Sequence, residues 1–299
     1  MKKLLMSLSL TLAMSNTVFA STDTPVDFPQ NLIFVSPHPD DILLTFAGLI
    51  DNNDGFTKHN ISHSVIFTLS QWTENANPKD LSDNRITKVS MQRYVEENAA
   101  VNEMFRYKAR IETYGYPDAP IRHYEGPKTL GGAPAGNFST FRAQEISIYE
   151  QLVPVFENKL QTPSCAMFVL MANGSHIDHF IVREAVITAV RRLGSKASCK
   201  IYFGEDQPYT GIDPKGSMKQ MTAIQQRLNL QKIPYNIDHG KKIAAFAKHY
   251  ISQYSDDYGV GINKWAEING GKEDLYYWDP KYYNNKNTIE PSCTKEFCK

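Results

Sequence analysis

The sequence has little of what marks several classes of protein. It contains 4 cysteines, and no pair of them has zinc-finger spacing with another pair. Its 32 basic and 32 acidic residues balance, so no excess charge would attract nucleic acid or an anionic membrane. Beyond residue 20 no apolar run is long enough to cross a bilayer. We therefore expect neither a nucleic-acid partner nor a membrane anchor.

The first twenty residues have the pattern of a signal peptide. Two lysines are followed by the apolar stretch LLMSLSLTLAM, and Val18-Phe19-Ala20 places small side chains at the cleavage positions. We expect residues 1–20 to be removed and the mature chain to be exported to the periplasm or secreted. The remaining ~280 residues are enough for one large core.

All four cysteines follow this segment, and an even count in an exported chain favours disulfides. Cys165 and Cys199 each begin a strand-like run, so adjacent strands would bring them together. Cys293 and Cys298 would close a small loop near the C-terminus. We predict these two bridges.

The hydrophobic pattern alternates between strands and helices, which predicts an α/β fold. The expectation is a Rossmann-like, mostly parallel sheet flanked by helices, in one domain over residues 21–261. An aromatic-rich tail over 262–299 is expected to pack irregularly on that domain, and 126–140 to form a loop. The predicted strands are 31–36, 63–71, 109–116, 166–172 and 200–206, and the predicted helices are 41–53, 84–105, 145–160 and 180–194.

Two polar clusters follow predicted strands. SPHPDD (36–41) follows the first strand and holds His38, Asp40 and Asp41, whereas HIDH (176–179) follows the fourth. Ligands of doubly wound sheets gather at such carboxyl ends. Imidazole and carboxylate groups form a partial shell for zinc, and an adjacent carboxylate can accept a proton from water. Either histidine of the second cluster would complete a His–Asp–His set.

Each cluster alone also has a plainer explanation. HPDD is compatible with a turn in which an aspartate caps the following helix, and two histidines near a helix start are often surface residues. Both clusters at strand ends of one sheet favour a metal site. His–Asp–His with open positions suits Zn²⁺ and also Fe²⁺.

From about residue 30 to 255 the chain resembles the PIG-L/LmbE-like zinc-dependent N-acetyl-sugar deacetylases. Their motifs [AP]HPDDE and HPDH correspond to Pro37-His38-Pro39-Asp40-Asp41 and His176-Ile177-Asp178-His179. The resemblance implies zinc ligands His38, Asp41 and His179, with Asp40 as the general base. It implies that His176 stabilises the oxyanion or acts as general acid, and that Asp178 orients His176.

Weaker similarities extend the resemblance. Arg93-Tyr94-Val95-Glu96 is similar to an R-x-x-E helix, and KKIAAFAKHYISQ (241–253) to a late K…A…SQ helix. Arg93 and Asp118 are implied to bind substrate, although pairing of Arg93 with Glu96, and a buried structural role for Asp118, explain them equally well. Ile42 replaces the family glutamate, and we expect that change to remove a carboxylate from the pocket edge.

Together these features predict an exported zinc hydrolase that removes acetyl from an N-acetylated amino sugar or glycan. The partner would be a small-molecule or oligosaccharide substrate. Two alternatives remain: a zinc amidase acting on a non-sugar acyl-amide, and an inactive carbohydrate-binding protein. The sequence decides neither the particular substrate nor the oligomeric state.

Overall fold

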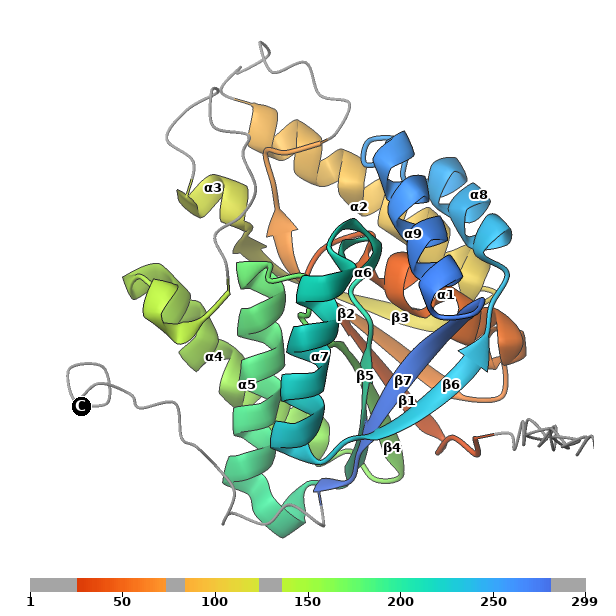
Figure 1. Ribbon diagram of the computed structural model, residues 1–299. Helices are drawn as coiled ribbons and strands as arrows, with labels where there is room; N and C mark the ends of the chain where they lie inside the picture. Colours follow the sequence, from red (N-terminus) through yellow and green to blue (C-terminus); the bar gives the residue numbers. More distant parts are fainter. Residues whose placement is uncertain (1–25, 74–83, 124–135, 281–299) are drawn as a thin grey trace, which may run out of the picture.

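The computed structural model describes residues 26–73, 84–123 and 136–280. A seven-stranded sheet runs through the described chain in the order β3-β2-β1-β4-β5-β7-β6 (Figure 1). Neighbouring pairs among β1 to β5 are parallel, whereas β7 is antiparallel to both β5 and β6. The strands are β1 Asn31–Ser36, β2 Asn60–Leu69, β3 Ala109–Pro117, β4 Cys165–Leu170, β5 Cys199–Gly204, β6 Gln231–Asn236 and β7 Lys272–Trp278.

Helices cover both faces of the sheet, as the alternating pattern predicts. In Figure 1, α4, α5 and α7 lie on one face, and α1, α2, α8 and α9 on the other. The α-helices are α1 Asp41–Asn52, α2 Arg85–Met104, α3 Ala119–His123, α4 Ala143–Leu160, α5 Ile177–Leu193, α6 Tyr209–Ile212, α7 Pro214–Leu228, α8 His239–His249 and α9 Asp256–Ile268. Short 3₁₀ turns are η1 Asp54–Phe56, η2 Phe138–Thr140 and η3 Gly194–Lys196.

Each face of the sheet carries its own core because strand side chains alternate. On β1, Ile33 and Val35 pack toward α4 and α5, whereas Leu32 and Phe34 pack toward α1. Phe34 and Phe168 stack with their ring centroids 4.5 Å apart. β1, β2, β4 and β5 are largely buried on both sides, which explains their near-continuous apolar runs, whereas the edge strand β3 has only half-buried and exposed residues.

The expected irregular tail is wrong over residues 262–278. Ile262 lies inside α9, so the proposed domain boundary at residue 261 cuts a helix. Residues 272–278 form β7, whose LYYW segment pairs antiparallel with β5 inside the sheet. The aromatic residues here are strand residues facing the two cores. Residues 281–299, including Cys293 and Cys298, lie outside the described residues, as do residues 1–20.

The order in which the chain adds strands to the sheet reverses at β1. It first adds β2 and β3 on one side of β1, and then crosses to add β4 and β5 on the other side. The segments leaving the carboxyl ends of β1 and β4 therefore diverge, and the crevice between them is the usual ligand position in such sheets. Both polar clusters of the sequence leave the sheet at this crevice.

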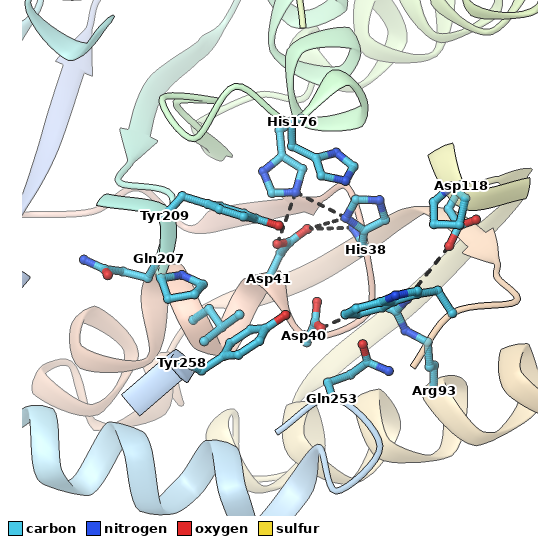
Figure 2. A pocket seen from close by; sticks show the side chains of 15 residues that line it. His38, Asp40, Asp41, Arg93, Asp118, His176, Gln207, Tyr209, Gln253 and Tyr258 are labelled. Atoms are coloured by element: carbon cyan, nitrogen blue, oxygen red, sulfur yellow. Dashed lines mark hydrogen bonds and ion pairs between the residues drawn. The ribbon is translucent and has the colours of Figure 1, made fainter. Parts of the chain in front are cut away.

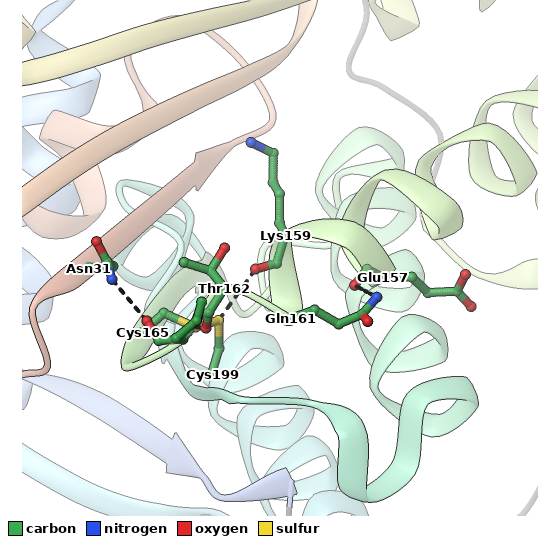
Figure 3. Close-up of a disulfide and its surroundings, with 8 residues drawn as sticks. Asn31, Glu157, Lys159, Gln161, Thr162, Cys165 and Cys199 are labelled. Atoms are coloured by element: carbon green, nitrogen blue, oxygen red, sulfur yellow. Dashed lines mark hydrogen bonds between the residues drawn. A yellow bond between two sulfur atoms is a disulfide. The ribbon is translucent and has the colours of Figure 1, made fainter.

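The predicted Cys165–Cys199 disulfide is present, whereas Cys293 and Cys298 lie outside the described residues. Cys165 and Cys199 are register partners on β4 and β5, with Cα atoms 4.5 Å apart (Figure 3). They lie at the amino ends of these strands, opposite the crevice. Disulfides are typical of exported proteins. Among the described helices, none has the length and apolar character required to cross a membrane.

Candidate metal centre

The turn between β1 and α1 places three ionisable side chains at the crevice. His38 and Asp41 are joined locally, because the His38 backbone N–H donates to Asp41 Oδ2 at 2.7 Å. Asp40 adopts φ 110°, a region that residues other than glycine rarely enter. The Asp40 carbonyl accepts the first N–H groups of α1, from Leu43 and Leu44. The turn thus caps the helix through its backbone and leaves the carboxylates available.

The second cluster begins α5. The helix starts at Ile177, three residues earlier than predicted, so His176 becomes its N-cap. The His176 Nδ1 atom accepts the backbone N–H of Asp178 at 3.2 Å, which places the ring proton on Nε2. Ile177 is fully buried in the core beside α4. One helical turn later, His179 faces the first cluster.

The predicted ligand set forms a compact group. His38 Nδ1 lies 3.2 Å from His179 Nε2, and Asp41 places its two oxygens 3.4 Å and 3.5 Å from these nitrogens. Tetrahedral ligands on zinc, with bonds of ~2.0–2.1 Å, lie about 3.4 Å apart. The spacing of these donor atoms is therefore close to that of ligands around one divalent ion. A nitrogen of His176 also belongs to the group, since ligand atoms of the three histidines lie within 4.8 Å of one another.

The outer nitrogens of the two ligand histidines face carboxylates. His38 Nε2 lies 2.9 Å from Asp178 Oδ2, and His179 Nδ1 lies 3.2 Å from Asp206 Oδ2. If each outer N–H donates to its carboxylate, both inner nitrogens present lone pairs to each other across 3.2 Å. That contact is repulsive unless a metal ion or a proton lies between the nitrogens. Carboxylates that hold the tautomer of metal-bound histidines are a regular feature of such sites.

The resemblance implied that Asp178 orients His176. In the structure the Asp178 carboxylate makes no hydrogen bond to His176. The carboxylate contacts His38 and accepts the N–H of Ala119 at 2.8 Å and a guanidinium N–H of Arg122. The connection to His176 runs through the Asp178 backbone. Asp178 points at the first cluster because it lies at the second position of α5, where its side chain leaves the helix beside β1.

The buried charges interact strongly. Burial alone would lower the pKa of His38, but bonds to Asp178 and Asp41 raise it to about 10 in the absence of a metal. The pKa of Asp41, which burial would raise, is lowered to about 2 by His179 and His38. Burial raises the pKa of Asp40 to about 7, even though the Arg93 charge opposes this. Without a metal ion, Asp40 therefore gains and loses its proton near neutrality.

Burial also keeps His176 uncharged. It lowers the pKa of His176 well below 6.5, and the neighbouring His179 and His38 add to this effect. At neutral pH the ring is a neutral donor at Nε2. This state favours the oxyanion-stabilising role among the two that the resemblance implied.

Arg93 pairs with the turn between β1 and α1 and not with Glu96. Its Nη2 donates to Pro39 O at 2.9 Å and to Asp40 Oδ2 at 3.4 Å, and its Nη1 lies 3.9 Å from Asp118 Oδ2. Glu96 instead accepts the N–H and hydroxyl of Ser252. Asp118 also accepts the N–H of Ile121 at 3.2 Å, so it serves both the pocket and the start of α3.

A small cavity of about 60 Å³ is lined by His38, Asp40, Asp41, Arg93, Asp118, His176 and His179. Figure 2 shows the Tyr209 hydroxyl beside the Asp41 carboxylate and the Tyr258 hydroxyl directed toward Asp40. Burial, with the charges of Asp41 and Asp40, raises the pKa of Tyr209, which therefore keeps its proton. Gln253 closes the cavity below Asp40 (Figure 2). The remaining lining residues include Leu44, Trp72, Pro120, Gln207 and Pro208.

Ile42 does not lie at the pocket edge, contrary to the expectation. Its side chain is fully buried in the core with Phe34 and Phe46. Replacement of the family glutamate therefore leaves the described pocket wall unchanged.

Sequence reasoning missed Asp206 and Tyr209. Asp206 follows β5 in the segment FGED, and Tyr209 begins α6 directly after the cis peptide Gln207–Pro208. Asp206 also accepts the N–H groups of Ala172 and Gly174, which ties it to the segment carrying His176. The rule that located the two clusters, polar residues at carboxyl ends of parallel strands, would also have found Asp206.

Comparison with known proteins agrees with this arrangement. The family model described as "PIG-L: GlcNAc-PI de-N-acetylase" matches residues 33–190, which include both clusters. The 2'-N-acetylparomamine deacetylase of Streptomyces fradiae is 30% identical over 196 residues, covering 64% of this chain. This match spans 63% of that relative's length.

Solved structures share the fold at low identity. A deacetylase–teicoplanin complex from the teicoplanin biosynthesis pathway superposes with a TM-score of 0.56 at 16% identity, covering 83% of this chain and 97% of the other. The N,N'-diacetylchitobiose deacetylase from Pyrococcus horikoshii gives a TM-score of 0.51 at 14% identity, covering 89% and 88%. With the family model matching more than half of the sequence, these findings lead to one conclusion: the chain belongs to the PIG-L family.

Proposed function

We propose that this protein is an exported, metal-dependent hydrolase that removes the acetyl group from an N-acetylated amino sugar or glycan. One observation carries the proposal: His38 Nδ1 and His179 Nε2 face each other at 3.2 Å, with Asp41 beside both and carboxylates behind both. This arrangement is suited to a cation. His38, Asp41 and His179 would hold it, with Zn²⁺ the first candidate and Fe²⁺ compatible with the same donors.

A bound divalent ion would supply Lewis acidity toward the acetamide carbonyl and toward water. The chain's own groups complete the chemistry. Asp40 lies beside the ligand set without belonging to it, and its raised pKa suits a base that takes a proton from the attacking water. Neutral His176 presents Nε2–H as a donor for the developing oxyanion. The bond between the acetyl carbonyl carbon and the sugar nitrogen then breaks. The amine takes up the proton that Asp40 accepted from water, and acetate is released.

The surrounding residues support a sugar-sized substrate. Arg93 and Asp118 supply polar groups on one wall, and Trp72, Tyr209 and Tyr258 supply aromatic faces. The Streptomyces fradiae relative is named for an acetylated amino-sugar compound, and this supports the same substrate class here. The N-terminal segment and the Cys165–Cys199 disulfide support export.

The test is incubation of the purified mature chain with a panel of N-acetylated glycans and non-sugar acyl-amides. Mass spectrometry should reveal loss of one acetyl group from a sugar, with acetate released in equal amount. A chelator should abolish release, and added Zn²⁺ or Fe²⁺ should restore it. Release from acyl-amides alone would support the amidase alternative, and glycan binding without release would support the binding alternative.

A further inference from the structure

A buried carboxylate on α2 contacts the proposed general base from behind. Glu97 Oε2 accepts the backbone N–H of Asp40 at 3.0 Å. Glu97 is 1% exposed and does not line the cavity. It therefore has no access to a substrate, and its influence on the reaction would have to pass through Asp40.

The backbone of Asp40 is strained, and Glu97 is one of the groups that hold it. At φ 110° the side chain of Asp40 points in a different direction from that of a residue with negative φ at the start of a helix. The carbonyl side of the residue is fixed by Leu43 and Leu44 of α1. Its N–H side is fixed by Glu97. Because φ is the rotation between that N–H and the side-chain-bearing carbon, the Glu97 bond bears directly on where the carboxylate points.

Glu97 is itself held by two distant elements. Its Oε1 accepts from His63 Nε2 on β2 at 2.5 Å, and its Oε2 also accepts from the hydroxyl of Tyr250, which follows α8. His63 and Tyr250 are both fully buried. A carboxylate that accepts hydrogen bonds from Asp40, His63 and Tyr250 has little freedom to move. The backbone N–H of Asp40 is therefore held in a fixed position as well.

We propose that Glu97 is a positioning residue for Asp40, with His63 and Tyr250 fixing Glu97 in turn. This proposal rests on the proposed function, because it takes Asp40 to be the base that accepts the proton from water. It adds a residue outside the two metal-binding motifs and outside the cavity. Glu97 sets the angle of attack of the base and takes no proton itself.

The first measurement requires no substrate. In the wild-type protein the Asp40 amide should exchange with solvent as slowly as core strand amides, although it lies in a turn at the cavity. Fast exchange of this amide would overturn the proposal whatever the enzymatic activity. Because this measurement uses the wild-type protein, it tests the bond between Glu97 and the Asp40 amide even if a variant does not fold. It also tests that bond if no deacetylation is found.

The second measurement uses variants and full kinetics. Glu97→Ala should accelerate Asp40 amide exchange at least tenfold and lower kcat by about 10- to 100-fold, with KM changed less than twofold and metal content retained. Glu97→Gln keeps an acceptor for the N–H and should recover kcat to within about threefold of wild type. Loss of metal, or a loss in KM alone, would contradict a positioning role.

A matched control separates positioning from general destabilisation. Glu273 is also 1% exposed and, like Glu97, accepts from a tyrosine hydroxyl, that of Tyr235. Its second donor is Lys242, and neither of these hydrogen bonds involves a residue of the centre. Glu273→Ala should lower the melting temperature while leaving kcat and Asp40 exchange unchanged. Equal kcat losses in the Glu97→Ala and Glu273→Ala variants would refute the proposal.

Discussion

Replacing Asp40 by asparagine should destroy activity and, at the same time, stabilise the metal-free protein at alkaline pH. The folded-state pKa of Asp40 is raised from 3.8 to about 7, so the folded protein holds a proton that the unfolded chain has already lost. The group therefore favours the folded state most at low pH. This contribution is lost as pH rises from about 4 through about 7.

The magnitude follows from the shift. About three pKa units at 1.36 kcal/mol each set a ceiling of about 4 kcal/mol, of which about 2–3 kcal/mol is lost between pH 5 and pH 8. Asparagine resembles the protonated acid but does not titrate, so the variant loses none of this stabilisation as the pH rises. The free energy of unfolding of Asp40→Asn, relative to wild type, should therefore increase by about 2–3 kcal/mol over this range.

Urea unfolding of the chelator-treated proteins at the two pH values measures this difference. Turnover of the metal-loaded variant should fall by about 10²- to 10⁴-fold, with one metal ion per chain retained. Asp51→Asn is the control, because Asp51 is exposed and pairs with Lys241 on the surface. A stability difference that does not change with pH, or substantial remaining turnover, would refute the reasoning about Asp40.

Four further outcomes are expected. His176→Ala should keep its metal, measured by elemental analysis, and lose about 10²–10³ in kcat; loss of the metal instead would make His176 a ligand. Asp178→Asn should weaken metal affinity by about 10- to 100-fold in competition with a chelator, and unchanged affinity would contradict the contact with His38. Because the metal-free pKa of His38 is raised to about 10, a metal must displace its proton; affinity should fall steadily with acidification in a titration from pH 8 to pH 6, and a flat profile would exclude this competition. Joint replacement of Cys165 and Cys199 by alanine removes a bridge across 34 residues and should lower the free energy of unfolding by about 3–4 kcal/mol, with kcat unaffected; a kcat loss would link that end of the sheet to the centre.

Most of the parallel part of the fold is predictable from sequence because β1, β2, β4 and β5 are largely buried on both faces. Their apolar runs are continuous, and the helices between them have amphipathic spacing. β6 and β7 lack this signal. β6 has the alternating pattern of an edge strand, and the aromatic residues of β7 resemble a surface tail until their partners on β5 are known.

Within the centre, the motif residues were predictable and their contacts were not. His38, Asp41 and His179 meet because β1 and β4 are adjacent. The alternation of elements implied that both clusters lie at the same edge of one sheet, but not this adjacency. The direction of the Asp178 carboxylate depends on the start of α5 at Ile177 and on Arg122, 56 residues away. Neither is encoded in the spacing of the motif. The burial of Ile42 likewise follows from the tertiary packing of α1.

The segment from Asp118 to Arg122 has a consequence for how this protein can change over evolution. Asp118 lines the cavity, whereas Ala119 and Arg122 bind the carboxylate that supports His38. A mutation that reshapes this wall for a new substrate thus also alters how firmly His38 is held. New specificities should arise more readily around Tyr258, which lines the cavity from α9 and not from this segment.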